Sequence, residues 1–230
     1  MTWRALGEAR RYLAAALLAE LGLLLAGHRP GRVLLGAGAL CAIFFRDPDR
    51  PGVLDPERVY AAADGVVVGV EPATDAWMGD GAAVRVSTFL SLHNVHVNRS
   101  PVAGRIAAAE EVSGTFAPAL FGRAGENQRR RLAIDGDAGR VVVVQVAGAI
   151  ARRIASWVEI GTNVSAGQRI GLIHFGSRTD VLLPASSVEV TVKVGERVRG
   201  GVSALARYRR EGTACGSTSH RRIWSQAAAS

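Results

Sequence analysis

Two apolar runs near the N-terminus, separated by a short basic connector, constrain the fold more than any other feature of the sequence. Residues 12–27 read YLAAALLAELGLLLAG with one acid, Glu20, and residues 33–45 read VLLGAGALCAIFF with no charge. As helices of 16 and 13 residues they would reach about 24 and 20 Å, whereas the hydrocarbon core of a bilayer is about 30 Å thick. The runs therefore predict a hydrophobic helical hairpin over residues 1–46 that associates with a membrane from one side, with residues 28–32 (HRPGR) as its turn.

Two other interpretations of these runs stay open. A signal peptide would explain a basic start followed by an apolar stretch, but no A-x-A-like cleavage sequence follows it. A pair of buried helices in a soluble protein would explain the same residues.

The charge of the chain favours an anionic partner. The 28 bases exceed the 20 acids, which gives a net charge of +8, and every base except Lys193 is an arginine, suited to bidentate binding of phosphate and carboxylate. A nucleic acid fits poorly, because aromatic residues make up only 6% of the chain and no stacking pattern recurs. An anionic membrane surface fits better, since arginines flank the apolar runs: Arg4, Arg10, Arg11, Arg46 and Arg50.

After residue 51 the sequence changes to short Val/Ile-rich runs separated by glycines, which predicts a mainly β (α+β) domain over residues 47–206. We expect a compact β-sandwich or barrel-like hybrid, in which residues 161–171 and 195–201 form glycine-rich β-hairpins. Residues 207–230 are predicted to be a basic, flexible tail. The expected strands are residues 59–62, 65–71, 83–89, 104–111, 131–135, 141–146, 170–175, 180–183 and 188–194.

Three places in the β domain carry residues with chemical potential. Asp64 stands between two apolar stretches, where it is either a turn residue before glycine or a carboxylate that orients an imidazole. His93 and His96 are three apart, which fits two structural histidines or two separate acid–base tasks, while no third ligand completes a metal site. Gly176-Ser177 is either an ordinary turn or a peptide bond that the serine hydroxyl can attack.

Several ordered motifs together resemble the phosphatidylserine decarboxylase family, specifically its short, archaeal-type bacterial branch. The resemblance spans residues 44–184, and the hydrophobic N-terminus is also similar. Two departures are visible: FGSR replaces the LGST of the long-form enzymes, as in the short branch, and NQR replaces the more usual NER. The matching motifs are FFRDPDR, ADG at Asp64, LHNVHVNRSP, ENQRRRLAI and IGLIHFGSRTDVLLP.

The resemblance implies a proenzyme that cleaves itself between Gly176 and Ser177 into a β chain of 176 residues and an α chain of 54 (230 minus 176). In that scheme Asp64 orients His96, His96 is the base for the Ser177 hydroxyl, and Ser177 becomes a covalent pyruvoyl cofactor. The pyruvoyl group forms a Schiff base with phosphatidylserine, and His93 donates the proton that completes phosphatidylethanolamine. No metal is implied.

The resemblance also implies partners and a location. The enzyme would work peripherally on the cytoplasmic face of the cell membrane, with phosphatidylserine and an anionic lipid surface as partners and its own α and β chains as a heterodimer. Assembly beyond this heterodimer stays open. The main alternative is a membrane-tethered β-hairpin carrier or adaptor module without catalysis, which is disfavoured because Lys193 lies in a strand-like run rather than at a turn. A membrane serine hydrolase is a weaker interpretation, since no G-x-S-x-G motif is present.

Overall fold

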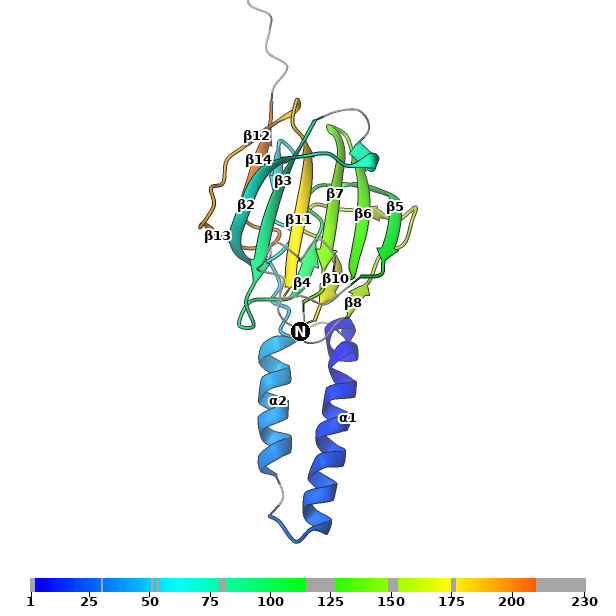
Figure 1. Cartoon of the computed structure of the whole chain (residues 1–230), viewed down its shortest axis with the longest axis vertical. Coiled ribbons are helices and arrows are strands. Elements are labelled where there is room, and N and C mark those ends of the chain that lie inside the picture. Colours follow the sequence, from blue (N-terminus) through cyan, green and yellow to red (C-terminus); the bar gives the residue numbers. More distant parts are fainter. Residues whose placement is uncertain are drawn as a thin grey trace, which may run out of the picture.

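A computed structural model describes residues 3–29, 31–50, 52, 54–78, 82–114, 127–148, 153–174 and 177–209. Two helices project together from one end of a β domain, beside β4, β8 and β10 (Figure 1). The prediction for Gly176 and most of the predicted tail, residues 210–230, lie outside the described residues. The elements are α1 (Trp3–Leu25), α2 (Arg32–Phe44), β1 (Arg58–Tyr60), β2 (Gly65–Ala73), η1 (Ala76–Met78), β3 (Ala83–Leu90), β4 (Val97–Arg99), β5 (Gly104–Val112), β6 (Arg129–Gly136), β7 (Gly139–Val146), β8 (Ile154–Ser156), β9 (Asn163–Val164), β10 (Arg169–Ile173), β11 (Ser177–Pro184), β12 (Val188–Val190), β13 (Arg197–Val198) and β14 (Ala204–Tyr208).

The helical hairpin is confirmed, but α1 is longer than its apolar run. It has 23 residues, because its polar first turns also form helix and bury Ala5 and Ala9. The single acid of the run, Glu20, is buried and accepts hydrogen bonds from the backbone N–H groups of Gly31 and Leu34 at the start of α2. A carboxylate at a helix N-terminus satisfies donors that the helix itself leaves unpaired.

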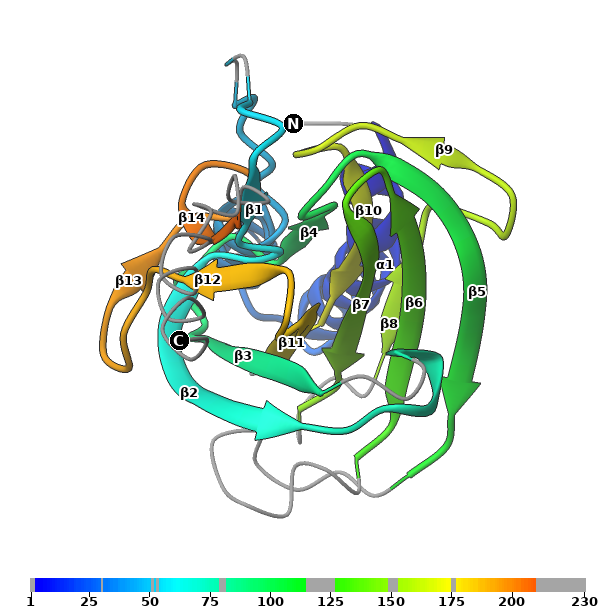
Figure 2. The same cartoon turned by 90° about the horizontal axis from the view of Figure 1, so that it is seen from above.

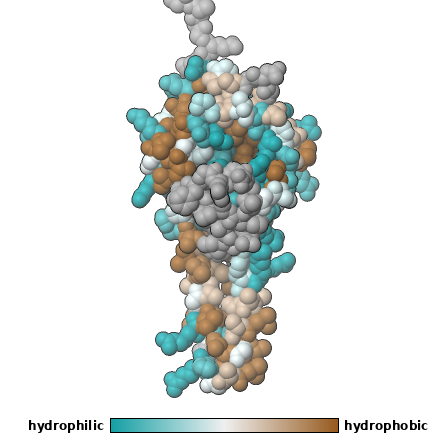
Figure 3. Space-filling model, viewed as in Figure 1, coloured by the Kyte–Doolittle hydropathy of each residue, from teal (hydrophilic) through white to brown (hydrophobic). Residues whose placement is uncertain are grey.

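The outer surface of the hairpin is apolar. Leu18, Leu25 and Leu35 are 70%, 83% and 75% exposed, and hydrophobic residues cover much of the two helices in Figure 3. No helix among the described residues has the length and apolar character needed to cross a membrane.

The mainly β prediction is also confirmed, and each expected strand has a counterpart in the structure. The large antiparallel sheet has the order β13-β2-β3-β11-β7-β6-β5-β9 and curls strongly, as seen from above in Figure 2. Two smaller sheets, β4-β10-β8 and β1-β14-β12, complete the domain. Buried Val, Ile and Leu side chains from the large sheet and β14 pack together as one core.

Three details of the sequence interpretation are wrong. The two glycine-rich segments are not hairpins, because β9 pairs with β5, β10 with β4 and β8, and β13 with β2. The strand at residue 188 ends at Val190, so exposed Lys193 lies outside it. The backbone carbonyl of Lys193 accepts a turn hydrogen bond from Glu196 N–H at 3.2 Å. Strand β14 continues through Tyr208 and so includes the first two residues of the predicted tail.

Candidate active site

The two histidines of the LHNVHVN segment lie in different environments. His93 is exposed in a turn, whereas His96 is fully buried directly before β4. Arg46 donates to the backbone carbonyl of His93 and so ties this turn to the segment that follows α2. Because β4 begins only at Val97, neither histidine belongs to a strand, and the rule of alternating strand faces does not apply to them.

His96 is held as a neutral base. Its Nδ1 lies 2.9 Å from the carbonyl oxygen of Asn94, which a neutral imidazole satisfies by donating from Nδ1–H. Its Nε2 has no hydrogen-bond partner among the described residues, and its ring lies 4.3 Å from that of Phe44. Burial lowers the pKa of His96 to about 4, so at neutral pH the Nε2 lone pair is free to accept a proton.

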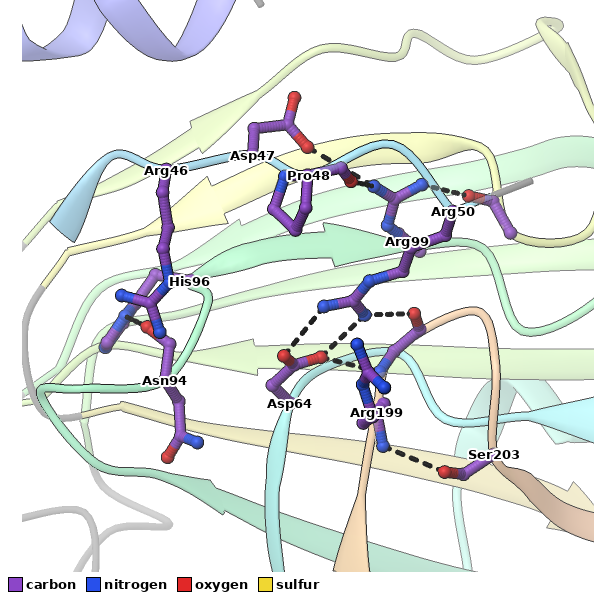
Figure 4. Close-up of polar contacts among 12 residues, drawn as sticks. Arg46, Asp47, Pro48, Arg50, Asp64, Asn94, His96, Arg99, Arg199 and Ser203 are labelled. Atoms are coloured by element: carbon purple, nitrogen blue, oxygen red, sulfur yellow. Dashed lines mark hydrogen bonds and ion pairs between the residues drawn. The ribbon is translucent and has the colours of Figure 1, made fainter. Parts of the chain in front are cut away.

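Asp64 does not orient His96 directly, which corrects the sequence prediction. Within the described chain its carboxylate is paired with Arg50, through Oδ1 at 2.6 Å and Oδ2 at 2.7 Å, and it also accepts the Gly200 N–H at 2.8 Å. Figure 4 shows Asp64 turned toward Arg50 and His96 toward Asn94. The charge of Asp64 therefore acts on His96 only through space. It raises the pKa of His96 by less than burial lowers it.

Gly65 and Arg50, the residues next to Asp64 in sequence and in space, are both closely packed. A Cβ at Gly65 would lie 2.0 Å from the backbone oxygen of Phe89, so glycine is needed for β2 to begin beside β3. Arg50 is buried to 5% side-chain exposure in the ion pair, so it cannot reach lipid phosphates, contrary to the expectation from the sequence.

A second ion-pair network joins three distant parts of the chain. Asp47 is buried, and its Oδ1 accepts hydrogen bonds from Arg99 Nη2 at 3.2 Å and Arg169 Nε at 2.8 Å. Arg99 also donates to Pro48 O at 2.9 Å, as Figure 4 shows, and Arg169 pairs with Asp49 at 2.6 Å. The network attaches the segment after α2 to β4, which begins directly after His96, and to β10, which pairs with β4.

Ser177 is the first residue of β11, where its backbone pairs with Leu90 of β3. The residue is fully buried, and its hydroxyl has no hydrogen-bond partner among the described residues. Ile173 N–H donates to His96 O at 3.2 Å. The end of β10, four residues before Ser177, therefore lies beside the backbone of His96.

His174 is a candidate that the sequence interpretation did not single out, although it stands in the IHFGSR motif. It is fully buried, and its Nδ1 lies 3.1 Å from the Tyr12 hydroxyl while its Nε2 lies 3.4 Å from Glu8 Oε2. Burial, followed by the charge of Arg11, lowers the pKa of His174 to about 3. The first turns of α1 thus pack directly on the chain that leads to Ser177.

Comparison with known proteins identifies the family of the chain. The family model described as phosphatidylserine decarboxylase matches residues 37–206. The chain is 45% identical over 179 residues to the phosphatidylserine decarboxylase proenzyme of Symbiobacterium thermophilum, covering 77% of this chain and 83% of that protein. It is 46% identical over 188 residues to the proenzyme of the same name from Gluconobacter oxydans, covering 78% and 83%.

A third relative, the phosphatidylserine decarboxylase proenzyme of Streptomyces coelicolor, is 43% identical over 173 residues, covering 75% of this chain and 74% of that protein. The matched region contains both ion-pair networks, the two histidines of the LHNVHVN segment and Ser177. The chain therefore belongs to the phosphatidylserine decarboxylase family and is a decarboxylase.

Proposed function

We propose that the protein is a proenzyme that cleaves itself between Gly176 and Ser177, converts Ser177 to a pyruvoyl group and decarboxylates phosphatidylserine on the cytoplasmic face of the cell membrane. The observation that carries this proposal is the fully buried Ser177 hydroxyl, which has no partner among the described residues. It stands at a Gly-Ser bond, in a domain that also holds a neutral imidazole with a free Nε2.

In self-processing, His96 Nε2 accepts the proton of the Ser177 hydroxyl, whose oxygen attacks the carbonyl carbon of Gly176. The peptide bond becomes an ester as the acyl group moves from nitrogen to oxygen. Elimination releases Gly176 as a carboxylate and leaves a carbon–carbon double bond at residue 177. Hydrolysis of the resulting enamine releases ammonia and leaves the pyruvoyl group. Asn94, rather than Asp64, sets the imidazole tautomer for this role.

The fold explains how two chains would remain one molecule after cleavage. Strand β11 of the α chain is hydrogen-bonded along both edges, to β3 and β7 of the β chain. Strands β13 and β14 likewise pair with β2 and β1. The α and β chains share one core and would stay associated as a heterodimer.

In decarboxylation, the pyruvoyl group supplies a carbonyl that takes up the substrate amine and accepts the electron pair of the broken carbon–carboxylate bond. The protein residue that returns a proton to that carbon is His93. It lies exposed in the turn that Arg46 anchors by a backbone hydrogen bond. Its placement in a loop also separates it from the buried His96, in line with two distinct tasks.

The hairpin supports the membrane part of the proposal. A diacyl lipid leaves the bilayer only at a cost of about 0.8 kcal/mol for each buried CH₂, so the enzyme must reach its substrate at the surface. Residues 1–46 would provide that attachment, because their exposed leucines gain a lipid environment while Arg29 and Arg32 at the tip can meet phosphates.

Intact mass measurement tests the proposal. The wild-type protein should give two chains of about 18.5 and 5.7 kDa, in proportion to 176 and 54 residues of a 24.2 kDa chain. A hydrazine reagent should label only the smaller chain. Ser177→Ala should give one unlabelled chain of full mass without decarboxylase activity. Wild-type protein that is active while intact would refute the pyruvoyl proposal.

A further inference from the structure

A row of buried polar side chains continues from Ser177 into the space between the large sheet and the sheet β4-β10-β8. Thr179 lies two residues along β11, so its side chain is on the same face as that of Ser177. Gln145 of β7 is the direct cross-strand partner of Thr179. From there Gln145 Nε2 donates to Asn98 Oδ1 of β4 at 2.6 Å, which joins the two sheets. Asn98 stands two residues after His96.

The sheets approach closely at this point. A Cβ at Gly171 of β10 would lie 3.1 Å from Gln145 Nε2 and 2.4 Å from Ala155 O. The contact with Ala155 is with the backbone of the neighbouring strand β8 and requires glycine at this position, and the contact with Gln145 shows that its amide lies directly against the Gly171 backbone.

These side chains are fully buried yet incompletely paired. Thr179 is 1% exposed and the others are 0% exposed. Each of them has one side-chain atom without a hydrogen-bond partner among the described residues: Asn98 Nδ2, Gln145 Oε1, Thr179 Oγ1, Ser177 Oγ and His96 Nε2. Whichever way round the two amides are turned, their mutual bond leaves one NH₂ group, with two N–H donors, and one carbonyl oxygen free. Buried polar groups in this state require a ligand or ordered water.

We propose that Asn98, Gln145 and Thr179 bind the amino-acid head group of the lipid substrate, an inference that rests on the proposed function of Ser177. The free amide N–H and the Thr179 hydroxyl donate to the α-carboxylate, and the free amide carbonyl accepts from the substrate nitrogen. An α-amino acid offers this combination of an anionic acceptor beside an N–H donor.

The chemistry of these groups suits a carboxylate that must leave. Neutral donors bind a carboxylate more weakly than a bidentate arginine does, so less ground-state binding is lost when the carboxylate becomes CO₂. The ethanolamine product has no carboxylate, so the two donors lose their partner when it forms. The site thereby distinguishes substrate from product.

Two near-isosteric substitutions test this inference. Thr179→Val removes the hydroxyl. Asn98→Asp keeps an acceptor for Gln145 but removes the free donor. The control is Ser100→Ala, because Ser100 is equally buried but its hydroxyl is already bonded to Val102 O at 2.7 Å. Intact mass first establishes that each variant is processed. Reductive trapping of the lipid amine on the α chain then measures binding from vesicles containing phosphatidylserine or phosphatidylethanolamine.

We expect normal processing in all three variants. The phosphatidylserine concentration giving half-maximal trapping should rise by about ten- to a hundred-fold in Thr179→Val and Asn98→Asp. The value for phosphatidylethanolamine should change by less than about two-fold, and Ser100→Ala should match the wild type with both lipids.

Several results would overturn the inference. Equal shifts for both lipids would show that the residues do not recognise the carboxylate, and no shift for either would show that they hold water only. Unprocessed variants would assign the residues to maturation instead. If Thr179→Val does not fold, Thr179→Ser must retain and Thr179→Ala must lose the preference for phosphatidylserine. A wild-type protein that is itself unprocessed would reject the proposed function rather than this subsite.

Discussion

The helical hairpin and the β domain bury their apolar side chains against different partners. In the β domain, Val, Ile and Leu from opposing strands form a closed core. In the hairpin, Leu18, Leu25 and Leu35 remain mostly exposed. The exposed leucines of the hairpin are therefore buried only if another surface covers them, whereas the β domain buries its core side chains against one another.

Polar groups differ between the two regions in the same way. The hairpin has one buried acid, Glu20, and uses it to cap α2. The β domain buries two ion-pair networks and a row of polar atoms beside Ser177 that have no partner in the described part of the chain. Substitutions of these buried polar groups in the β domain should thus disable chemistry or folding, while substitutions of exposed hairpin leucines should produce graded losses of membrane binding.

The largest effect is expected at His96. His96→Ala removes the proposed base, so processing should slow by about 10²- to 10⁴-fold. His93→Ala should be processed at the wild-type rate but turn over slowly. Time-resolved intact mass and a decarboxylation assay separate the two outcomes. Normal processing of His96→Ala would show that another group removes the Ser177 proton.

Breaking the Asp64–Arg50 ion pair should have the next largest effect. Arg50→Met leaves a nearly buried carboxylate unpaired and should lower the free energy of unfolding by about 3–5 kcal/mol. Arg58→Met is the matched control, because the Arg58–Asp55 pair is exposed, with side chains 46% and 38% accessible, and should change stability by at most about 1 kcal/mol. Urea denaturation measures both. Equal losses would show that burial of the pair is not what matters.

Substitution of one hairpin leucine should have a smaller effect, and on a different property. Leu18→Gln should weaken binding to anionic vesicles by about ten-fold or more, since a buried leucine contributes about 1.5–3 kcal/mol. Processing should be unchanged. Ile160→Gln alters a comparably exposed side chain of the β domain, at 63% against 70% for Leu18, and should not affect vesicle flotation. Identical behaviour of the two variants would remove the distinction between the regions.

Mild acid should lower the stability of the folded protein gradually. Burial keeps His96 and His174 neutral in the folded protein, with pKa values of about 4 and about 3, whereas in the unfolded chain the value is about 6.5. The unfolded state therefore gains protons first as the pH falls. Stability should be constant above about pH 6.5 and decrease toward pH 4, by about 1.4 kcal/mol per unit for each histidine at most.

Denaturant midpoints at pH 7 and 5.5 test this pH dependence. His174→Gln should reduce the slope, and His28→Asn, at an exposed position in the hairpin turn, should leave it unchanged. A slope that His28→Asn reduces as much as His174→Gln would contradict the assignment to buried histidines.

Sequence patterns predicted the elements of this protein well where the pattern was long. The apolar runs predicted the hairpin, and the Val/Ile-rich runs between glycines predicted β2, β3, β5, β6, β7 and β11. Strands of two or three residues, such as β9 and β13, were missed because so few positions show no periodicity. The polar start of α1 was also missed, since the residues that bury it belong to the β domain.

The site was predictable only as a set of residues. Motifs in the sequence identified Asp64, His93, His96 and Ser177 together, but their pairwise contacts could not be inferred from order along the chain. Arg50, at the end of the FFRDPDR motif, takes the place beside Asp64 that the prediction gave to His96. The backbone carbonyl of Asn94 then bonds to the imidazole, and no residue type in a sequence indicates such a contact.

By itself the sequence determined the family of this protein, its two-part construction and the bond that is expected to break, because these depend on local composition and ordered motifs. Only the tertiary structure decided which groups are neutral, which are paired and which are free. Those properties depend on burial and on contacts between strands. His96 is kept uncharged by the packing around it. Thr179 lies beside Gln145 because β11 pairs with β7, and Gln145 reaches Asn98 because β4 packs against that sheet.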